Sequence, residues 1–261
     1  MTNITTPRPP RRIQSVDVGF RVVRILEQAA GKLPLKRIAS EAGMPPSKVY
    51  LYLSSYAALG LVEQDEVTGH YGLGPYAVQL GLSAIRQLNI VDLSKRPLEQ
   101  LQVSTGQSAY LSVWGNMGPV ILLKYDNDQN SPVGIKVGSI LPLLRSATGR
   151  IFLSYLPETD LEPVLRREEA AASAKTVNRK KLAAGVRSAG IASSDGQVYE
   201  GFAALSAPIF DHANTLAGSF TILGLRRDFS PNTAGSNASL LLEAANQVSI
   251  ALGYRKSAIG E

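Results

Sequence analysis

Two segments of the sequence carry residues that could bind an anion. The first segment is basic, because nine Lys and Arg residues stand against three Asp and Glu residues up to Gly60. This excess of +6 equals the net charge of all 261 residues, so the chain after Gly60 is neutral as a whole. A basic segment joined to a larger neutral one is typical of a protein whose front end binds a polyanion such as DNA.

The second segment is LPLLRSATGR, residues 141–150. Here an extended stretch is predicted to run into a helix, whose first unpaired N–H groups would lie near Ser146 to Gly149. A carboxylate could accept hydrogen bonds from these amides and from the hydroxyls of Ser146 and Thr148, and Arg145 could pair with it. The alternative is that Ser146 only caps its own helix.

The residues that usually build a catalytic centre do not form a recognisable set. The chain has no Cys and two His, which excludes disulfides, thiolate metal sites and a His-rich metal centre. Neither His70 nor His212 has an apparent Ser or Asp partner, and residues 194–196, SDG, fit a turn. Walker-type and dinucleotide-binding glycine motifs are also missing from the sequence. We therefore expect no enzyme, no cofactor and no metal site.

The front segment contains three helices in the pattern of a helix-turn-helix. Apolar residues at helical spacing predict helices over residues 16–30, over residues 35–43, and from Pro45 or Pro46 onward. Gly43 suits the end of the second helix, and a proline suits the first turn of the third. Two helices joined by a short glycine turn are the arrangement called helix-turn-helix.

A β-hairpin is predicted to follow the third helix. Its strands would cover residues 61–64 and 70–73, with a short turn between them. Helices and hairpin together predict a winged helix-turn-helix domain over residues 15–75. Residues 1–14, which combine Pro and Arg, would form a flexible basic arm.

A winged helix-turn-helix places the second helix of its motif, here the third helix of the chain, in the major groove of DNA. We expect the exposed first turns of that helix to contact base edges with Ser47, Lys48 and Tyr50. The arm, the preceding helix and the hairpin would contact phosphates or the adjacent groove with Arg11, Arg12, Lys36 and His70. Double-stranded DNA is therefore the predicted partner.

The rest of the chain predicts a linker helix over residues 76–90 and a mixed α/β domain over residues 91–261, which makes the fold class α+β. Apolar periodicity predicts helices at 93–105, 146–156, 161–167, 179–189 and 238–254. Strands are expected at 108–114, at 120–125, near 134–137, at 202–209 and at 217–223.

Export and membrane insertion are not indicated by the sequence. No stretch approaches the roughly 20 apolar residues of a membrane span. The first residues, MTNITTPRPPRR, lack the apolar run of a signal peptide. We therefore expect a cytoplasmic protein without membrane contact.

Five stretches of the sequence have the pattern of one protein family. The front segment contains SVDVGFRVVRILE and LPLKRIASEAGMPPSKVYLYLSSYAALGLV, and its hairpin ends with TGHYGLG. The C-terminal part contains LPLLRSATGRIFLSYLP and GFAALSAPIFDHANTLAGSFTILG. From Ser15 to about Gly253 the chain thus resembles the IclR-type bacterial transcriptional regulators.

This resemblance implies that residues 91–261 form a GAF-like effector-binding domain, a sensor that holds a small molecule. It also implies a homodimer, or a dimer of dimers, with contacts from the first helix and the linker helix. The residues predicted to contact the effector are Trp114, Leu143, Arg145, Ser146, Thr148, Gly149, Ala204, Thr221 and Leu223. For Trp114 the alternative is packing in the core, which is common for a large aromatic residue on a strand.

The sequence departs from the family pattern at functional positions. Leu51 stands where the family commonly has an Arg in the recognition helix, and Tyr52 after it could face DNA or pack in the core. Ala204 stands at a usual Cys, Thr221 at a pocket Ser, and Leu223 at a second Ser. A pocket with fewer polar groups favours a larger, partly aromatic acid over a small polar one such as glyoxylate.

The sequence therefore predicts a DNA-binding regulator whose operator binding is controlled by a small organic acid. Two alternatives stay open at this point. The altered residues Ala204 and Leu223 allow a constitutive repressor that responds to no ligand. The replacement at Leu51 allows a ligand-binding protein with weak affinity for DNA.

Overall fold

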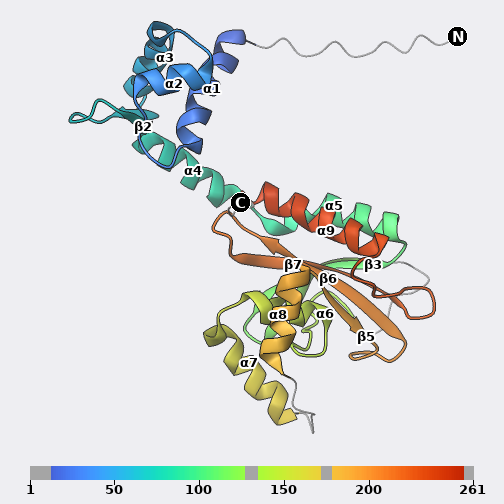
Figure 1. Ribbon diagram of the computed structural model, residues 1–261. Coiled ribbons are helices and arrows are strands. Elements are labelled where there is room, and N and C mark those ends of the chain that lie inside the picture. The colour runs from blue at the N-terminus through green and yellow to red at the C-terminus, as the bar shows by residue number, and fades with distance from the viewer. Residues whose placement is uncertain (1–12, 127–134, 172–177, 256–261) are drawn as a thin grey trace, which may run out of the picture. The chain divides into compact units, whose positions relative to one another are not determined.

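The structure, a computed structural model, describes residues 13–126, 135–171 and 178–255. The chain divides between Gln87 and Leu88 into two compact units, each with its own buried core. The first unit is mainly helical, and the second combines a sheet with helices (Figure 1). The predicted α+β fold class is confirmed.

The first unit contains a helix-turn-helix followed by a two-stranded wing. Its elements are α1 (Gln14–Gln28), α2 (Leu35–Ala42), α3 (Pro46–Ala58), β1 (Val62–Gln64), β2 (Tyr71–Leu73) and α4 (Pro75–Gln87). Gly43 ends α2 with a φ of 63°, a left-handed conformation that glycine adopts without strain. Pro46 opens α3, where its missing N–H group costs no hydrogen bond. β1 and β2 pair antiparallel.

The core of this unit lies where the first three helices meet. Val22 of α1, Ile38 of α2, and Val49 and Leu53 of α3 are all fully buried. The four-residue spacing from Val49 to Leu53 keeps both side chains on one face of α3, so the opposite face is free for contacts outside the unit. α4 differs from these helices, because none of its residues is buried.

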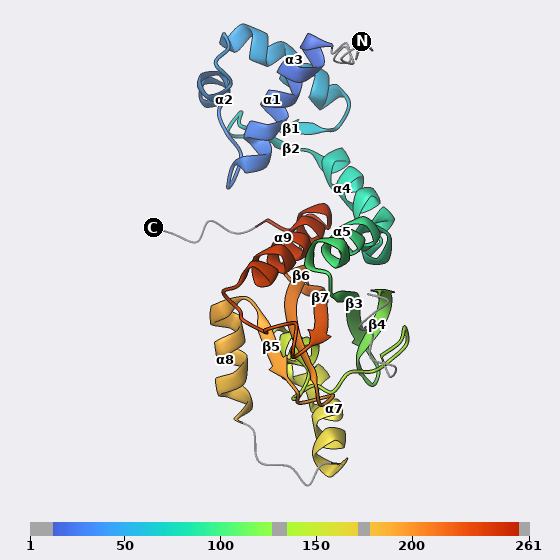
Figure 2. The same cartoon turned by 90° about the vertical axis from the view of Figure 1, so that its right-hand side faces the viewer.

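The second unit is built on an antiparallel sheet with helices on both faces. The strands are β3 (Ser108–Gly115), β4 (Gly118–Tyr125), β5 (Ala192–Asp195), β6 (Phe202–Phe210) and β7 (Leu216–Leu225), in the order β4-β3-β7-β6-β5. The helices are α5 (Ile90–Thr105), α6 (Ala147–Tyr155), α7 (Glu158–Ala171), α8 (Arg179–Ala189) and α9 (Ser236–Ala251). α5 and α9 lie side by side on one face, and α6 and α8 lie on the other (Figures 1 and 2).

Alternation of side chains along the strands gives this sheet two different faces. Leu111 of β3 and Leu205 of β6 are fully buried in the apolar cluster that includes α5 and α9. Tyr110 and Ala204, one position away on the same strands, pack with Ala147 at the start of α6. The face toward α6 therefore carries the polar side chains that form the site described below.

A strand was expected near residues 134–137, but residues 135–137 form no strand, so this prediction was wrong. Gly134 lies outside the described residues, while Ile135 and the residues after it lead into a turn at Gly138, whose φ is 87°. A single bridge between Val120 and Ile140 then connects this segment to the sheet. The turn at Gly138 leaves too few consecutive residues for a strand.

Residues 194 and 195, expected in a turn, are instead the end of β5, and the turn begins at Gly196 with a φ of 68°. The sequence of β5, ASSD, has neither apolar alternation nor β-branched residues. It forms a strand because all four of its residues pair antiparallel with residues 203–206 of β6.

Two kinds of feature are missing from the described parts of the chain. No helix there combines the length and the apolar character that crossing a bilayer requires. No group of three or more His, Asp or Glu side chains is placed there to hold a metal ion.

Candidate functional site

The outward face of α3 carries the residues predicted to contact DNA bases. Because Val49 points into the core, its neighbours Ser47, Lys48 and Tyr50 are exposed. Tyr50 is 50% exposed, and Leu51 beside it is 66% exposed. This face therefore combines one cation, hydroxyl groups and apolar atoms, a mixture that can meet both the polar edges and the methyl groups of bases.

Tyr52 and Tyr56 hold α3 against α1. Their rings lie 6.4 Å apart, and both side chains pack against the core of the first unit. A Cβ atom at Gly19 of α1 would lie 2.2 Å from the Tyr56 hydroxyl oxygen and 3.0 Å from the Tyr52 ring. Glycine at this position thus lets the two helices approach each other. Tyr52 therefore packs inside the first unit, and its neighbour in the sequence, Leu51, faces outward.

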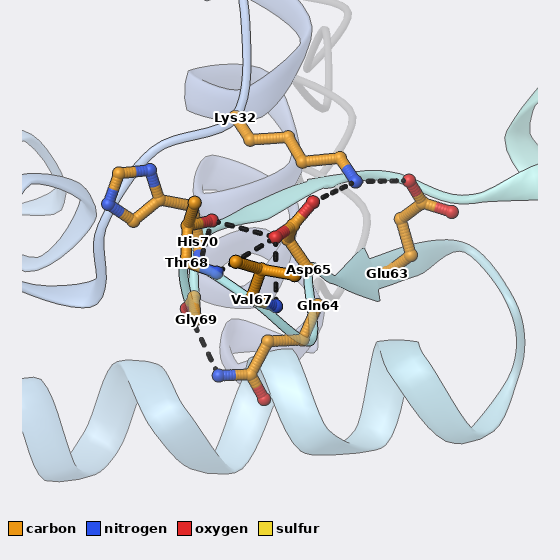
Figure 3. A network of polar contacts seen from close by, with 8 residues as sticks. All are labelled: Lys32, Glu63, Gln64, Asp65, Val67, Thr68, Gly69 and His70. Carbon is orange, nitrogen blue, oxygen red and sulfur yellow. Dashed lines mark hydrogen bonds and ion pairs between the residues drawn. The ribbon is translucent and has the colours of Figure 1, made fainter.

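A network of polar contacts holds the turn of the wing (Figure 3). Oδ1 of Asp65 accepts hydrogen bonds from the amides of Val67 and Thr68, at 3.1 and 2.9 Å, and from the Thr68 hydroxyl at 3.0 Å. Oδ2 accepts from Lys32 Nζ at 3.2 Å, and Lys32 also pairs with Glu63 at 2.9 Å. The hydrogen bonds from Thr68, above all, hold the pKa of Asp65 well below its ordinary value. The tip residue, Val67, is 95% exposed.

Two of the four residues predicted to contact phosphates, Lys36 and His70, belong to the part of the chain that the structure describes. Lys36 is on the exposed side of α2. His70 is half-buried just before β2, and its imidazole points away from the Asp65 network (Figure 3). Arg11 and Arg12 lie outside the described residues.

In the second unit a small cavity lies between the start of α6 and the sheet. Its volume is about 20 Å³, which is room for about one water molecule. The walls come from the strands, from α6 and from the loop between β5 and β6, through Tyr110, Ile135, Ser146, Ala147, Ser194, Val198, Tyr199, Phe202, Ala204 and Leu223. A cavity of this size does not hold an organic acid.

Four hydroxyl groups form a buried chain that starts at this cavity. Tyr110 Oη lies 3.3 Å from Thr148 Oγ1, which lies 2.8 Å from Thr221 Oγ1. Thr221 donates to Ser206 at 2.8 Å, and Ser206 donates to the carbonyl of Phe220 at 3.1 Å. Because each hydroxyl has one proton, this last bond sets the direction of all the others. Thr148 must donate to Thr221, and Tyr110 must donate to Thr148.

This direction leaves Tyr110 with a free acceptor position on its oxygen. Burial raises the pKa of Tyr110 to about 12, so the side chain stays a neutral phenol. Any further polar partner of the Tyr110 oxygen must therefore be a donor.

The start of α6 supplies the donors. The Ser146 hydroxyl caps the helix by accepting from the Gly149 amide at 2.8 Å, and it donates to the carbonyl of Pro142 at 2.6 Å. The amides of Ala147 and Thr148 have no hydrogen-bond partner in the described parts of the chain. Two N–H groups thus lie at the positive end of a helix, and Ala147, which carries one of them, lines the cavity.

Glu168 of α7 already supplies a carboxylate to the loop before α6. Its two oxygens accept hydrogen bonds from the amides of Leu143 and Leu144, the latter at 3.3 Å. These two loop amides are therefore already paired with a carboxylate.

The predicted effector residues divide into two groups. Ser146, Ala204 and Leu223 line the cavity, while Thr148 and Thr221 belong to the hydroxyl chain. The structure brings these five together from one helix and two strands.

The other four predicted residues lie away from the cavity wall. Leu143 and Trp114 pack in a separate apolar cluster around α6 and α7. Arg145 is exposed to solvent. Gly149 has a packing role, because a Cβ atom there would lie 2.3 Å from the carbonyl oxygen of Pro142.

Three polar residues of the cavity were missed from the sequence: Tyr110, Ser194 and Tyr199. Tyr110 lies four residues before Trp114 on a predicted strand, so both side chains point to the same face, and the strand pattern contained a signal for the inward direction of Tyr110. Ser194 was assigned to a turn, and Tyr199 lies in an irregular loop without a repeating pattern.

Comparison with known proteins accounts for both units. The IclR helix-turn-helix domain matches residues 15–66, and the family of bacterial transcriptional regulator IclR C-terminal domains matches residues 82–250. The glycerol operon regulatory protein of Streptomyces griseus is 29% identical over 249 residues, which cover 93% of this chain and 96% of that protein. The transcriptional repressor IclR of Escherichia coli is 23% identical, over 96% of this chain and 94% of that protein.

Solved structures agree with these matches. The crystal structure of Pseudomonas aeruginosa HmgR superposes with a TM-score of 0.88 at 32% identity and covers 94% of this chain and 100% of that one. The Agrobacterium tumefaciens repressor BlcR shares the fold, with a TM-score of 0.79 at 21% identity over 94% and 99% of the two chains. The protein is thus a DNA-binding transcriptional regulator and not an enzyme, and it belongs to the IclR family of bacterial transcriptional regulators.

Proposed function

We propose that this regulator binds its operator as a homodimer and that a small organic acid, bound at the cavity beside α6, controls the binding. The observation that carries the proposal is the polar pattern at that cavity. Two unpaired amides, of Ala147 and Thr148, lie at a helix start, and the Tyr110 oxygen offers an acceptor beside them. Donors at a positive helix end suit a carboxylate.

In the DNA complex α3 lies in the major groove. Ser47 and Lys48 donate hydrogen bonds to base edges, and Lys48 reaches the acceptors of guanine. Tyr50 and Leu51 offer apolar atoms, which suit the methyl group of thymine. Because Leu51 is exposed where the family commonly has Arg, part of the readout here comes from apolar contact rather than from charge.

Cations around α3 position the protein on the duplex. Lys36 on α2 and His70 at the wing contact phosphates, and Arg11 and Arg12 of the basic arm reach the phosphates or the adjacent groove. The slope of log K against the logarithm of the salt concentration becomes more negative by about 0.9 for each phosphate that a cation neutralises, so binding weakens as salt is added.

A homodimer covers apolar side chains that the first unit leaves exposed. Phe20 of α1 is 55% exposed, and Val78, Leu80 and Leu82 of α4 are 62%, 55% and 53% exposed. Exposed apolar side chains gathered on helices mark interfaces. A twofold dimer also presents two copies of α3 to half-sites one DNA turn, about 34–36 Å, apart. Dimers of dimers would extend the same symmetry. A partner that is bacterial operator DNA implies a cytoplasmic protein.

The effector in this proposal is an acid with a second polar group. Its carboxylate accepts hydrogen bonds from the Ala147 and Thr148 amides, and a hydroxyl or N–H group donates to Tyr110. Its apolar body packs on Phe202 and Leu223, which suits an aromatic ring. The loop between β5 and β6 opens to admit it.

Two measurements on the full-length protein test this proposal. Hydroxylated and plain aromatic acids are screened for a rise in melting temperature, because a ligand that binds the folded state stabilises it. Each hit is then added to a fluorescence anisotropy titration of DNA from the regulator's own promoter, over a salt series. We expect a hydroxylated aromatic acid to raise the melting temperature and to shift DNA affinity, and a Tyr110→Phe variant to respond less.

A constitutive regulator is the second candidate, and the size of the cavity favours it. At about 20 Å³ the closed cavity holds no organic acid, and Ala204 and Leu223 leave its walls apolar. Salt-dependent DNA binding that no acid in the screen changes would support this candidate. Weak, salt-insensitive binding to promoter DNA would contradict both.

A further inference from the structure

A second hollow lies in the second unit, along α8 and away from the cavity beside α6. This groove has a volume of about 510 Å³, within the range of about 300–1,000 Å³ usual for small-molecule sites. Its apolar wall comes from Leu182, Val186 and Ile191, and Gly185 leaves room along it. A Cβ atom on Gly185 would meet no other atom within 4 Å.

Arg150 of α6 lies at one side of this groove and forms no ion pair with the residues that the structure describes. Its Nε donates to the carbonyl of Leu144 at 3.2 Å, and its two terminal nitrogens donate to the carbonyl of Ser193 and to the side chain of Gln197. All three acceptors are neutral, and two of the five guanidinium N–H groups remain for another partner. Burial lowers the pKa of Arg150, because the partly buried guanidinium has lost part of its hydration.

The groove has a second cation and no acid. Lys181, in the first turn of α8, lies on the groove wall with Arg150, and no Asp or Glu does. Within the described parts of the chain neither cation forms an ion pair. Arg150 is partly buried, and a partly buried charge is normally paired, whereas Lys181 is exposed and adds a second positive charge to the groove. An apolar groove with these two cations is complementary to an anion that has an apolar body.

We propose that this groove is a second small-molecule site, which binds an organic carboxylate with an apolar body through Arg150 and Lys181. The carboxylate lies against the two cations, and the apolar body lies along Val186 and over Gly185. The proposal stands independently of effector control through the cavity beside α6.

The site would also be connected to that cavity. Arg150 bonds to Gln197, and the next two residues of the same loop, Val198 and Tyr199, line the cavity. A carboxylate that replaced Gln197 as a partner of the guanidinium would remove one contact between α6 and this loop. Occupation of the groove would then make the cavity easier to open.

Isothermal titration calorimetry of the full chain tests the proposal with 4-phenylbutyrate and its neutral primary amide. Lys181→Glu replaces one of the two positive charges of the groove by a negative charge. Lys180→Glu makes the same change at an exposed neighbour outside the groove. Gly185→Leu fills the groove, and Ala184→Leu adds the same side chain at an exposed neighbour that does not line it. Melting temperatures show that each variant is folded.

We expect the carboxylate to bind and the amide to bind about tenfold more weakly or not at all, since a hydrogen bond to a charged group is lost. Lys181→Glu should weaken the carboxylate about tenfold or more, and Gly185→Leu should abolish its binding, while both control variants bind like the wild type. The proposal is overturned if neither probe binds, if the two probes bind alike, or if both groove variants bind like the wild type. That last result would place the probe elsewhere, for example at the cavity beside α6.

Discussion

Thr221→Val tests whether the buried hydroxyl chain stabilises the second unit. Valine has nearly the shape of threonine, so the change removes a hydroxyl group without opening a hole. Thr221 is fully buried, and its oxygen takes part in two hydrogen bonds of 2.8 Å. In the variant Thr148 loses its acceptor, whereas Ser206 keeps the bond that it donates to the carbonyl of Phe220.

The expected magnitude follows from these contacts. A buried donor left without an acceptor costs about 1–3 kcal/mol. The methyl group that replaces the hydroxyl lies against the hydroxyls of Thr148 and Ser206, so it offsets little of this cost. A loss of about 1–3 kcal/mol in the free energy of unfolding would lower the melting temperature by about 2–12 °C for a unit of this size.

Trp114 makes this measurement specific to the second unit. It is the single tryptophan of the chain, and it is packed on α6 in that unit, so its fluorescence follows the unfolding of the second unit alone. Thr159→Val, at an exposed position of α7, is the matched control and should leave the melting temperature nearly unchanged. Equal melting temperatures for Thr221→Val and this control would refute the reasoning.

Three further predictions concern other parts of the molecule. Lys48→Ala should weaken operator binding by about 1–3 kcal/mol in an anisotropy titration, and unchanged affinity would remove Lys48 from the base contacts. Gly149→Ala should destabilise the second unit by about 1–3 kcal/mol in urea unfolding, because its Cβ meets backbone that cannot move aside, whereas Gly185→Ala in open space should not destabilise it. Folding lowers the pKa of Asp65, so its hydrogen bonds should persist at any pH above the ordinary carboxylate value of about 4 and be lost only as the pH falls further, through the lowered pKa. Hydrogen-exchange protection of the Thr68 amide should accordingly be the same at about pH 7 and about pH 5, and lower in Asp65→Ala at both.

The helices of the first unit could be predicted because their signals are local. Val49 and Leu53 repeat at helical spacing, and Gly43 and Pro46 mark the ends of their helices by their own backbone preferences. β5 could not be predicted in this way. Its residues have no strand pattern of their own, and the register offered by β6 decides their conformation.

The candidate site was only partly predictable for the same reason. Resemblance to a family pointed to Ser146 and Thr221, but the hydroxyl chain depends on which strands pair. Tyr110 of β3 lies opposite Thr221 of β7, and Thr221 lies opposite Ser206 of β6. These partners come from strands far apart in the sequence, so no local sequence pattern predicts their contacts.

The one-way order of the hydroxyl chain has a consequence for ligand discrimination. The chain from Tyr110 to the carbonyl of Phe220 behaves as one dipole rather than as four independent rotors, because no hydroxyl can turn without leaving its neighbour unpaired. An alcohol that donates to Tyr110 lengthens this dipole by one member. A ketone at the same place can only accept a hydrogen bond, and Tyr110 already donates its proton to Thr148. A hydroxy acid and the corresponding keto acid differ by two hydrogen atoms, so under the proposed function this site would distinguish the reduced from the oxidised form of one carbon skeleton without any charged residue in contact with that group.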